Sequence, residues 1–285
     1  MFYRSSFFLY LCTKKLSLYC MNILMIGAGN VAWHLASALE KKGHQISIVY
    51  SRRLENAQQL AQKLKHALAT DQTDFREVGA DLAIIAIKDD AITSVVQALQ
   101  LPHHTILVHT SGNTPMQIFE HLPGNNDFGV FYPLQTFSKQ KPVDFTYIPF
   151  CIEALNSSTE TLLFDLAGQL SNRIHSVNSF QRKVLHVAAV MACNFTNHLF
   201  AQSDHILQKE GLSFDLLKPL IQETVEKAMK NAPRKTQTGP AVRNDTRVIQ
   251  DHLKYLKNNP SAYQIYEAIT ESIFLWYGTE ENLID

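Results

Sequence analysis

Residues 21–35 read MNILMIGAGNVAWHL and carry the strongest local signal in the chain. The apolar run 23–26 is typical of a buried strand, and it ends at Gly27-Ala28-Gly29-Asn30-Val31-Ala32, which leads directly into a helical pattern. A G-x-G-x-x-A spacing between a strand and a helix is typical of a dinucleotide-binding βαβ unit. The alternative is a glycine turn with a structural purpose only.

Each residue of this turn has a physical reason to be there. Gly27 permits the tight turn, Gly29 lets a pyrophosphate approach the backbone, and Ala32 lets the helix pack closely on the strand. The helix N-terminus then offers unpaired N–H groups and a partial positive charge to the phosphates. We therefore expect Gly27, Gly29, Asn30, Val31 and Ala32 to bind the cofactor.

The composition is that of an ordinary globular protein. The chain has 285 residues, of which 46% are hydrophobic and 18% are charged. Lys+Arg and Asp+Glu balance at 26 each, which argues against nucleic acid and against an anionic membrane as partners. The four cysteines form no metal or disulfide framework, so we expect Cys151 and Cys193 to be buried thiols in a cytoplasmic, reducing compartment.

The first twenty residues, MFYRSSFFLYLCTKKLSLYC, contain a short apolar run that resembles a signal peptide. Lys14 and Lys15 interrupt that run, and no small-residue cleavage site follows it. We interpret residues 1–20 as a disordered extension or a start-codon artefact, with Met21 as the natural start. A targeting or membrane-proximal segment is the alternative.

Strand and helix patterns alternate after Met21. Strands are predicted at residues 45–50, 81–87, 105–109, 128–132, 149–153 and 174–177, and helices at 55–68 and 91–99. This alternation predicts an α/β fold, a Rossmann-type doubly wound and mainly parallel sheet, over residues 21–178. From Ser179 to Asp285 the patterns are helical only, at 179–207, 214–230, 245–256 and 261–277, which predicts an all-helical C-terminal domain.

The end of the second predicted strand indicates which nucleotide binds. An NAD site usually has Asp or Glu there, whereas this chain has Ser51, Arg52 and Arg53. A hydroxyl and two guanidiniums suit a 2′-phosphate, because arginine forms charge-assisted bonds to phosphate. We therefore expect NADP rather than NAD; two solvated surface arginines are the alternative.

Ligands in open α/β sheets bind beyond the carboxyl ends of the strands. Ile87 and Lys88 follow one such strand, and His109 and Ser111 end the next, where the nicotinamide is expected. Ser111 could bind the cofactor amide or a substrate carboxylate, or belong to an ordinary Ser-Gly turn. Asp89 and Asp90 are interpreted as N-caps of the helix that follows.

Candidate catalytic residues lie in the helical pattern after Ser179. Lys183, His186, Val190, Asn194 and Asn197 recur every three or four residues and are expected on one helix face. His186 is the preferred proton-transfer residue, because histidine titrates near neutrality. The alternative is a buried structural histidine.

Arg243 lies in the loop TGPAVRND at 238–245. It could reach a substrate carboxylate or phosphate, or pair locally with Asp245, which could also cap the next helix. No set of histidines has the spacing of a metal site, so no metal is expected. The apolar stripe 263–276 of the last helix is interpreted as core or subunit interface.

The stretches IGAGNVAWHL, DLAIIAIKDDAI, VHTSGNTP, FYPLQTF, LHVAAVMACNFTNHL and TGPAVRND together resemble one family. It comprises bacterial Rossmann-like proteins with a C-terminal domain of unknown function, relatives of NADP-dependent deazaflavin oxidoreductases, pyrroline-5-carboxylate reductases and β-hydroxyacid dehydrogenases. The resemblance implies an NADP-binding reductase or dehydrogenase whose helical domain binds substrate and forms a homodimer. Lys183 and Asn194 resemble the catalytic Lys and Asn of the β-hydroxyacid dehydrogenases in type, but their spacing is longer.

Two functions from different classes follow. The first is an NADP(H)-dependent oxidoreductase that transfers a hydride to or from a small carbonyl, imine or hydroxyacid held between Ser111, His186, Asn194 and Arg243. The alternative is a non-catalytic NADP-binding sensor or interaction protein. Deazaflavin reduction is a third function, which the resemblance to the related family implies.

Overall fold

The computed structural model describes residues 20–120 and 126–277. Contacts divide the chain into two units, one ending at Ala189 and the other beginning at Val190. The predicted domain boundary at Ser179 lies earlier, because the helix that begins there makes its contacts with the first unit. The predicted extension 1–20 lies outside the described residues, apart from Cys20.

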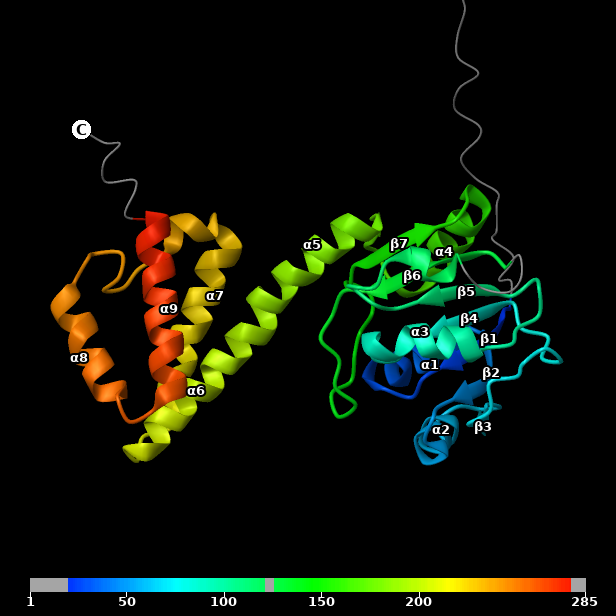
Figure 1. Ribbon diagram of the computed structural model, residues 1–285, viewed down its shortest axis with the longest axis horizontal. Coiled ribbons are helices and arrows are strands. Elements are labelled where there is room, and N and C mark those ends of the chain that lie inside the picture. The colour runs from blue at the N-terminus through cyan, green and yellow to red at the C-terminus, as the bar shows by residue number, and fades with distance from the viewer. Residues whose placement is uncertain (1–19, 121–125, 278–285) are drawn as a thin grey trace, which may run out of the picture. The chain divides into compact units, whose positions relative to one another are not determined.

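The first unit is built on an eight-stranded sheet of order β3-β2-β1-β4-β5-β6-β7-β8 (Figure 1). The strands are β1 (Asn22–Ile26), β2 (Gln45–Tyr50), β3 (Leu68–Thr70), β4 (Leu82–Ile85), β5 (Ile106–His109), β6 (Phe128–Pro133), β7 (Phe150–Ala154) and β8 (Ile174–Ser176). Neighbouring strands are parallel except β6 and β7, which are antiparallel. The order 3-2-1-4-5-6 is that of a Rossmann sheet, so the predicted fold class is confirmed.

Helices cover both faces of this sheet. They are α1 (Asn30–Lys41), α2 (Leu54–Ala61), α3 (Asp89–Ala98) and α4 (Ser157–Leu170), whereas α5 (Ser179–Ala189), which also belongs to the first unit, buries only Arg182. Strand side chains alternate between the faces, so Ile23 and Met25 pack with α1, α2 and α4, whereas Leu24 and Ile26 pack with α3. Because both faces are covered, β1 is apolar and buried from Ile23 to Ile26.

Strand β3 and helix α4 are among the elements that were not predicted. The helix predicted at 55–68 ends earlier, at Ala61, and β3 begins at Leu68. Helix α4 begins after Asn156, whose side chain accepts a hydrogen bond from the backbone N–H of Thr159 at 2.9 Å. Its buried residues Leu163 and Leu166 anchor it on the sheet.

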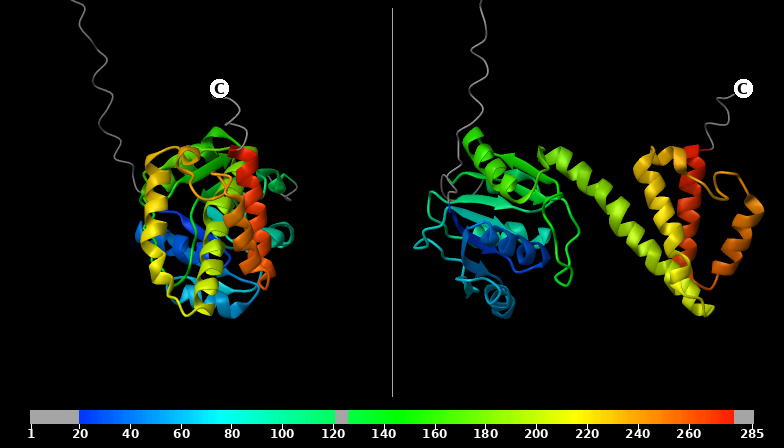
Figure 2. Two further views of the ribbon diagram at one scale, coloured as in Figure 1. Left: turned by 90° about the vertical axis from the view of Figure 1, so that its left-hand side faces the viewer. Right: turned by 180° about the vertical axis from the view of Figure 1, so that it is seen from behind.

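The second unit is helical, as predicted (Figure 2). It contains a π-helical turn (Val190–Phe195), α6 (Thr196–Lys209), α7 (Lys218–Lys230), α8 (Thr246–Leu256) and α9 (Pro260–Tyr277). Asp245 occupies the N-cap position of α8, but its side chain does not form the expected capping bond. A cavity of about 320 Å³ lies within this unit and is lined mainly by apolar residues of α6, α8 and α9.

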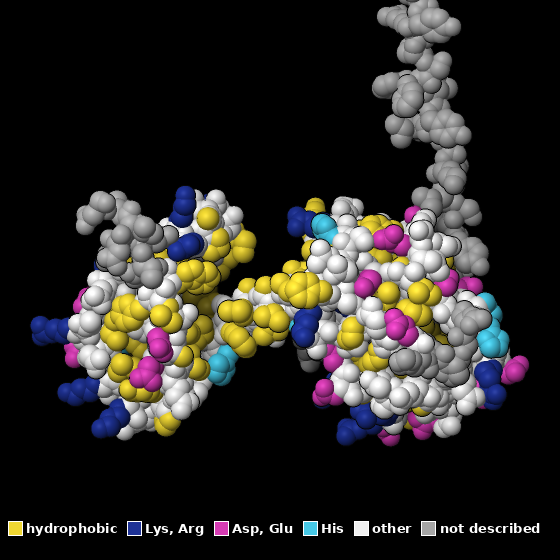
Figure 3. Space-filling model, turned by 45° about the horizontal axis from the view of Figure 1, so that its top comes forward, with side chains coloured by type: hydrophobic (Ala, Val, Ile, Leu, Met, Phe, Trp, Pro, Cys, Tyr) yellow, Lys and Arg dark blue, Asp and Glu magenta, His cyan; other side chains and the backbone are white. Residues whose placement is uncertain are grey.

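Large apolar side chains are exposed along α5 and on the helical unit (Figure 3). The segment Ser179–Lys209 is the one described helix that is long and apolar enough to cross a membrane by length and composition, with none of its apolar window buried. Helices that pack in subunit interfaces have the same features. Cys151 is buried as expected, whereas Cys193 is exposed on the π-helical turn.

Candidate functional site

The carboxyl ends of the parallel strands surround a cavity of about 650 Å³ in the first unit. The glycine turn, the ends of β2, β4, β5 and β6, and one residue of α5 all contribute to its wall. The lining includes Gly27, Ala28, Gly29, Asn30, Val31, Ser51, Arg52, Ile87, Lys88, Asp89, Ser111, Gly112, Tyr132, Gln135, Lys139 and His186. A cavity at this edge of the sheet is where an open α/β fold binds its ligand.

Gly27 and Gly29 are required at this turn for different structural reasons. Gly27 adopts a φ of +124°, and a Cβ there would lie 2.3 Å from the backbone oxygen of Ala86, so only glycine fits. A Cβ at Gly29 would meet nothing closer than that same oxygen at 3.9 Å, so the space above it is open. Since Gly29 caps α1 without a side-chain hydrogen bond, the first N–H groups of the helix face that space. The turn therefore fits a pyrophosphate, whereas Ala32 is fully buried and serves packing.

The end of β2 presents one of the two predicted arginines to the cavity. Ser51 and the exposed Arg52 line it, together with Asn56 of α2. Arg53 occupies the N-cap position of α2 and is not among the lining residues. The candidate contact to a 2′-phosphate is thus Arg52, with Ser51 beside it.

The end of β4 supplies Ile87 and Lys88 as predicted lining residues. Lys88 occupies the N-cap position of α3, while Asp89 and Asp90 lie in its first turn. The interpretation of the two aspartates as N-caps is therefore wrong, although their charges still favour the helix N-terminus. Asp89 also lines the cavity.

His109 at the end of β5 shapes the cavity wall from behind. It is fully buried, contacts Phe119 at 5.5 Å between ring centroids, and its Nδ1 accepts a hydrogen bond from the Ser111 N–H at 3.2 Å. Burial, with the neighbouring Arg182 guanidinium, lowers the pKa of His109 to about 3, so the ring is neutral. His109 is not among the lining residues, unlike Ser111.

The Ser111 hydroxyl is itself held in place. It donates to Thr114 Oγ1 at 3.0 Å and accepts from the backbone N–H groups of Asn113 and Thr114 at 3.1 and 2.8 Å. The turn after β5 is therefore fixed, with Ser111 at the cavity and Thr114 behind it.

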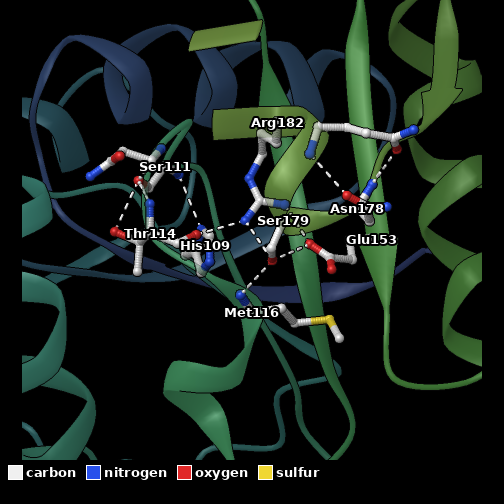
Figure 4. A network of polar contacts seen from close by, with 10 residues as sticks. His109, Ser111, Thr114, Met116, Glu153, Asn178, Ser179 and Arg182 are labelled. Atoms are coloured by element: carbon white, nitrogen blue, oxygen red, sulfur yellow. Dashed lines mark hydrogen bonds and ion pairs between the residues drawn. The ribbon is translucent and has the colours of Figure 1, made fainter. Parts of the chain in front are cut away.

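A buried arginine that the sequence did not reveal connects this turn to α5 (Figure 4). Arg182 is fully buried, pairs with Glu153 of β7, and donates to the Thr114 carbonyl oxygen at 2.6 Å. Ser179 donates to the Glu153 carboxylate at 2.7 Å and accepts from the N–H of Met116 at 3.0 Å. This network fixes the first turns of α5, and His186 lies one turn beyond Arg182.

His186 lies against the turn after β5 and beside Tyr132 of β6. A Cβ at Gly112 would come within 2.5 Å of His186 Nδ1 and 2.9 Å of Tyr132 Cζ, so the lack of a side chain there makes room for both rings. The Tyr132 hydroxyl lies 3.3 Å from His186 Nδ1. Burial raises the pKa of Tyr132 to about 12, so its hydroxyl keeps its proton at neutral pH. Tyr132 was not predicted, although it lies within the stretch FYPLQTF.

The other predicted catalytic residues are not brought to this cavity within the first unit. Lys183 is exposed and is not among the lining residues. Asn194 and Arg243 belong to the second unit, and their role stays a prediction. The single helix face predicted through Lys183, His186, Val190, Asn194 and Asn197 stays a prediction; a π-helical turn at Val190–Phe195 interrupts the α-helical period within it.

Two further expectations from the sequence concern an ion pair and a metal site. Arg243 forms no ion pair with Asp245 among the ion pairs found in residues 20–120 and 126–277. Within the same described residues, no three His, Cys, Asp or Glu side chains are grouped so that they could hold a metal ion.

Comparison with known proteins extends these observations. Residues 22–113 match the family model described as coenzyme F420-dependent NADP oxidoreductase, and residues 148–273 match a domain of unknown function, DUF2520. No curated protein matches the chain.

Solved structures show similarity over nearly the whole chain. A Bacteroides fragilis protein named as a candidate NADP oxidoreductase is 43% identical, with 90% of this chain and 99% of that chain covered and a TM-score of 0.79. A Thermotoga maritima protein is 22% identical, with 91% and 99% covered and a TM-score of 0.62. A reductive aminase from Aspergillus terreus, in complex with NADPH and ethyl-5-oxohexanoate, is 14% identical, with 93% and 94% covered and a TM-score of 0.60. The last two similarities show the fold only.

Proposed function

This chain belongs to the family of the Bacteroides fragilis candidate NADP oxidoreductase, and from that membership and the cavity we propose that it is an NADP(H)-dependent oxidoreductase. It transfers a hydride to or from a small carbonyl, imine or hydroxyacid. The observation that carries the proposal is one continuous cavity lined both by the glycine turn with Arg52 and by Ser111, Tyr132 and His186. Binding groups for a phosphorylated dinucleotide thus share one space with groups that can move a proton.

The residues fit NADP by their chemistry. Open space above Gly29 and the free N–H groups of α1 suit a diphosphate, and Arg52 with Ser51 suits a 2′-phosphate. When bound, NADPH supplies the hydride that reduces the substrate carbon.

The side chains of the cavity supply the proton and orient the substrate. Reduction of a carbonyl or imine leaves negative charge on oxygen or nitrogen, which must receive a proton as the hydride arrives. The Tyr132 hydroxyl is protonated at neutral pH and lies 3.3 Å from His186 Nδ1, so Tyr132 donates and His186 restores the proton from solvent. The Ser111 hydroxyl orients a polar group of the substrate or the cofactor amide.

The experiment measures NADPH oxidation with a panel of small ketones, keto acids and cyclic imines, alongside NADPH binding by calorimetry. Tyr132→Phe is expected to lower kcat about 100-fold, as loss of a proton donor does, while the Kd for NADPH stays unchanged. The matched control is Tyr147→Phe, an exposed tyrosine outside the cavity, which should leave both unchanged. Tight NADPH binding by the wild-type protein without turnover on any substrate would favour the sensor alternative instead.

We also propose that the protein is a homodimer through its helices. On α5, Phe180, Val184 and Val187 are 75%, 53% and 53% exposed and recur every three or four residues, so they form one apolar face of a kind that soluble monomers rarely expose. Leu216, Leu220, Val225 and Met229 on and before α7 are exposed as well.

Light scattering after size exclusion tests the homodimer. We expect a dimer for the wild type and a monomer for Val184→Glu combined with Val187→Glu, with the exposed Gln181→Glu on the same helix as the control. A wild-type monomer would contradict the proposal. Binding of the wild-type protein to neutral lipid vesicles, if the double variant abolishes it, would also contradict the proposal, because the apolar side chains would then contact lipid. A cytoplasmic location is proposed as well, supported by the free thiols Cys151 and Cys193.

A further inference from the structure

A loop that follows β6 folds over the first turn of α1 and carries a lysine to the cavity. The loop is held at two backbone carbonyls. Asn30 Nδ2 donates to the carbonyl oxygen of Phe137 at 2.9 Å, and His34 Nε2 donates to that of Ser138 at 2.8 Å. The Phe137 ring also stacks on the His34 ring at 5.9 Å between centroids. The position of the next residue, Lys139, is therefore set by the helix that begins at the glycine turn.

Lys139 and a second lysine flank one tryptophan. The Nζ of Lys139 lies 4.7 Å from the centroid of the Trp33 ring, and the Nζ of Lys63 lies 4.6 Å from it. Such cation–π contacts hold an ammonium without neutralising its charge. Among the residues that the structure describes, neither lysine has a carboxylate within ion-pair distance.

The two lysines differ in one respect that matters for binding. Lys139 is half-buried and lines the cavity with Gly29 and Asn30, whereas Lys63 is exposed and does not line it. The other charged residues of the lining are Arg52, Lys88 and Asp89. Arg52 follows β2, where the adenosine ribose binds in this fold, whereas Trp33 lies in the first turn of α1, where the diphosphate binds.

We infer that Lys139 is a cofactor-binding residue whose ammonium, held by Trp33 and by the loop anchors on Asn30 and His34, pairs with the diphosphate of the bound dinucleotide. The inference rests on the proposed function, because it takes the cavity to be the dinucleotide site. It adds a binding residue from outside the glycine turn, supplied by a loop more than 100 residues further along the chain. A diphosphate contact is common to NADPH and NADH, which separates it from a contact to the 2′-phosphate.

The test measures the Kd of NADPH and of NADH by calorimetry for Lys139→Gln and Lys63→Gln. Lys139→Gln should weaken both nucleotides by a similar factor, about 10-fold, which is the size of one charge-assisted contact. Lys63→Gln removes the other ammonium that contacts the Trp33 ring, and it should leave both Kd values unchanged. Lys139→Arg should restore most of the affinity, and the weakening in Lys139→Gln should shrink at high salt, because screening reduces an ionic contact.

The outcomes separate this inference from the function on which it rests. Unchanged affinities in Lys139→Gln, with a wild type that binds NADPH, would overturn the inference alone. A loss confined to NADPH would also overturn it, because it would place Lys139 at the 2′-phosphate. Equal losses in Lys139→Gln and Lys63→Gln would show an effect on Trp33 packing and overturn it as well. A wild type that binds neither nucleotide would overturn the proposed function and this inference together.

Discussion

Arg182 and Glu153 form an ion pair in which the arginine side chain is fully buried and the carboxylate side chain is 14% exposed. Arg182 lies near the start of α5 and Glu153 in β7, so the pair joins the helix that carries His186 to the sheet. The same guanidinium donates to the carbonyl oxygen of Thr114 at 2.6 Å. One buried charge therefore fixes both the turn after Ser111 and the start of α5.

Removal of the carboxylate is expected to destabilise the first unit strongly. Glu153→Ala leaves the Arg182 charge buried without its partner, which costs about 3–5 kcal/mol of the free energy of unfolding. Urea unfolding followed by circular dichroism measures this loss of stability. The control is Asp74→Asn in the exposed Asp74–Arg76 pair, where a small change is expected because exposed pairs contribute little. A loss in Glu153→Ala no larger than that in the control would contradict an anchoring role.

The two glycines of the turn should respond differently to alanine. Gly27→Ala forces a Cβ to within 2.3 Å of the Ala86 oxygen at a φ of +124°, so we expect loss of both stability and nucleotide binding. Gly29→Ala meets nothing within 3.9 Å in the protein and should leave the melting temperature unchanged, yet block the diphosphate. Thermal unfolding and NADPH titration check both. Full NADPH affinity in Gly29→Ala would show that the diphosphate lies elsewhere.

Much of this fold is predictable because its signals are local. The apolar run of β1, the glycine turn and the helix after it are adjacent in sequence, so periodicity together with the glycine spacing indicates a Rossmann unit. Strand β3 has only three residues and one paired neighbour, so it has no alternation to detect. The π-helical turn after α5 escapes prediction for a related reason, since its residues are as apolar as those of an ordinary helix.

The site is less predictable than the fold, because its polar groups meet over long sequence separations. Arg182 reaches Glu153 across 29 residues and Thr114 across 68, and no local pattern marks either contact. Tyr132 and His186 are 54 residues apart. His109 was expected at the cofactor for its place at a strand end, but strand residues alternate in direction, and its ring points into the core beside Phe119.

His109 should make the stability of the protein depend on pH. Burial lowers its pKa to about 3 in the folded protein, whereas an unfolded histidine titrates at about 6.5. Between these values only the unfolded chain binds the proton. The contribution of neutral His109 is therefore fully present above the unfolded pKa and is lost as the pH falls toward the folded pKa, by about 1.4 kcal/mol per pH unit.

Urea unfolding of wild type and His109→Asn from neutral to acidic pH measures this contribution. The wild type should lose stability more steeply below pH 6.5 than the variant, whose amide cannot take up the proton. His104→Asn replaces an exposed histidine and serves as the control, with a slope parallel to that of the wild type. Parallel curves for wild type and His109→Asn would contradict the burial of a neutral ring.

Arg52 and Arg53 should differ in their effect on cofactor choice, although the sequence suggests both. Arg52 lines the cavity beside Ser51, whereas Arg53 occupies the N-cap position of α2 outside the lining. Arg52→Gln is expected to weaken NADPH by about 10- to 100-fold, the size of one charge-assisted bond to phosphate, and to change NADH affinity little.

Calorimetric titration of both nucleotides into Arg52→Gln and Arg53→Gln measures this difference. Arg53→Gln serves as the matched control, because it removes the same charge one residue away and should leave both affinities near those of the wild type. Equal weakening of NADPH and NADH by Arg52→Gln would place the guanidinium at a phosphate that both nucleotides share. A loss of NADPH affinity in Arg53→Gln as large as that in Arg52→Gln would mean that the general positive charge at this strand end, rather than a contact within the cavity, selects the phosphorylated nucleotide.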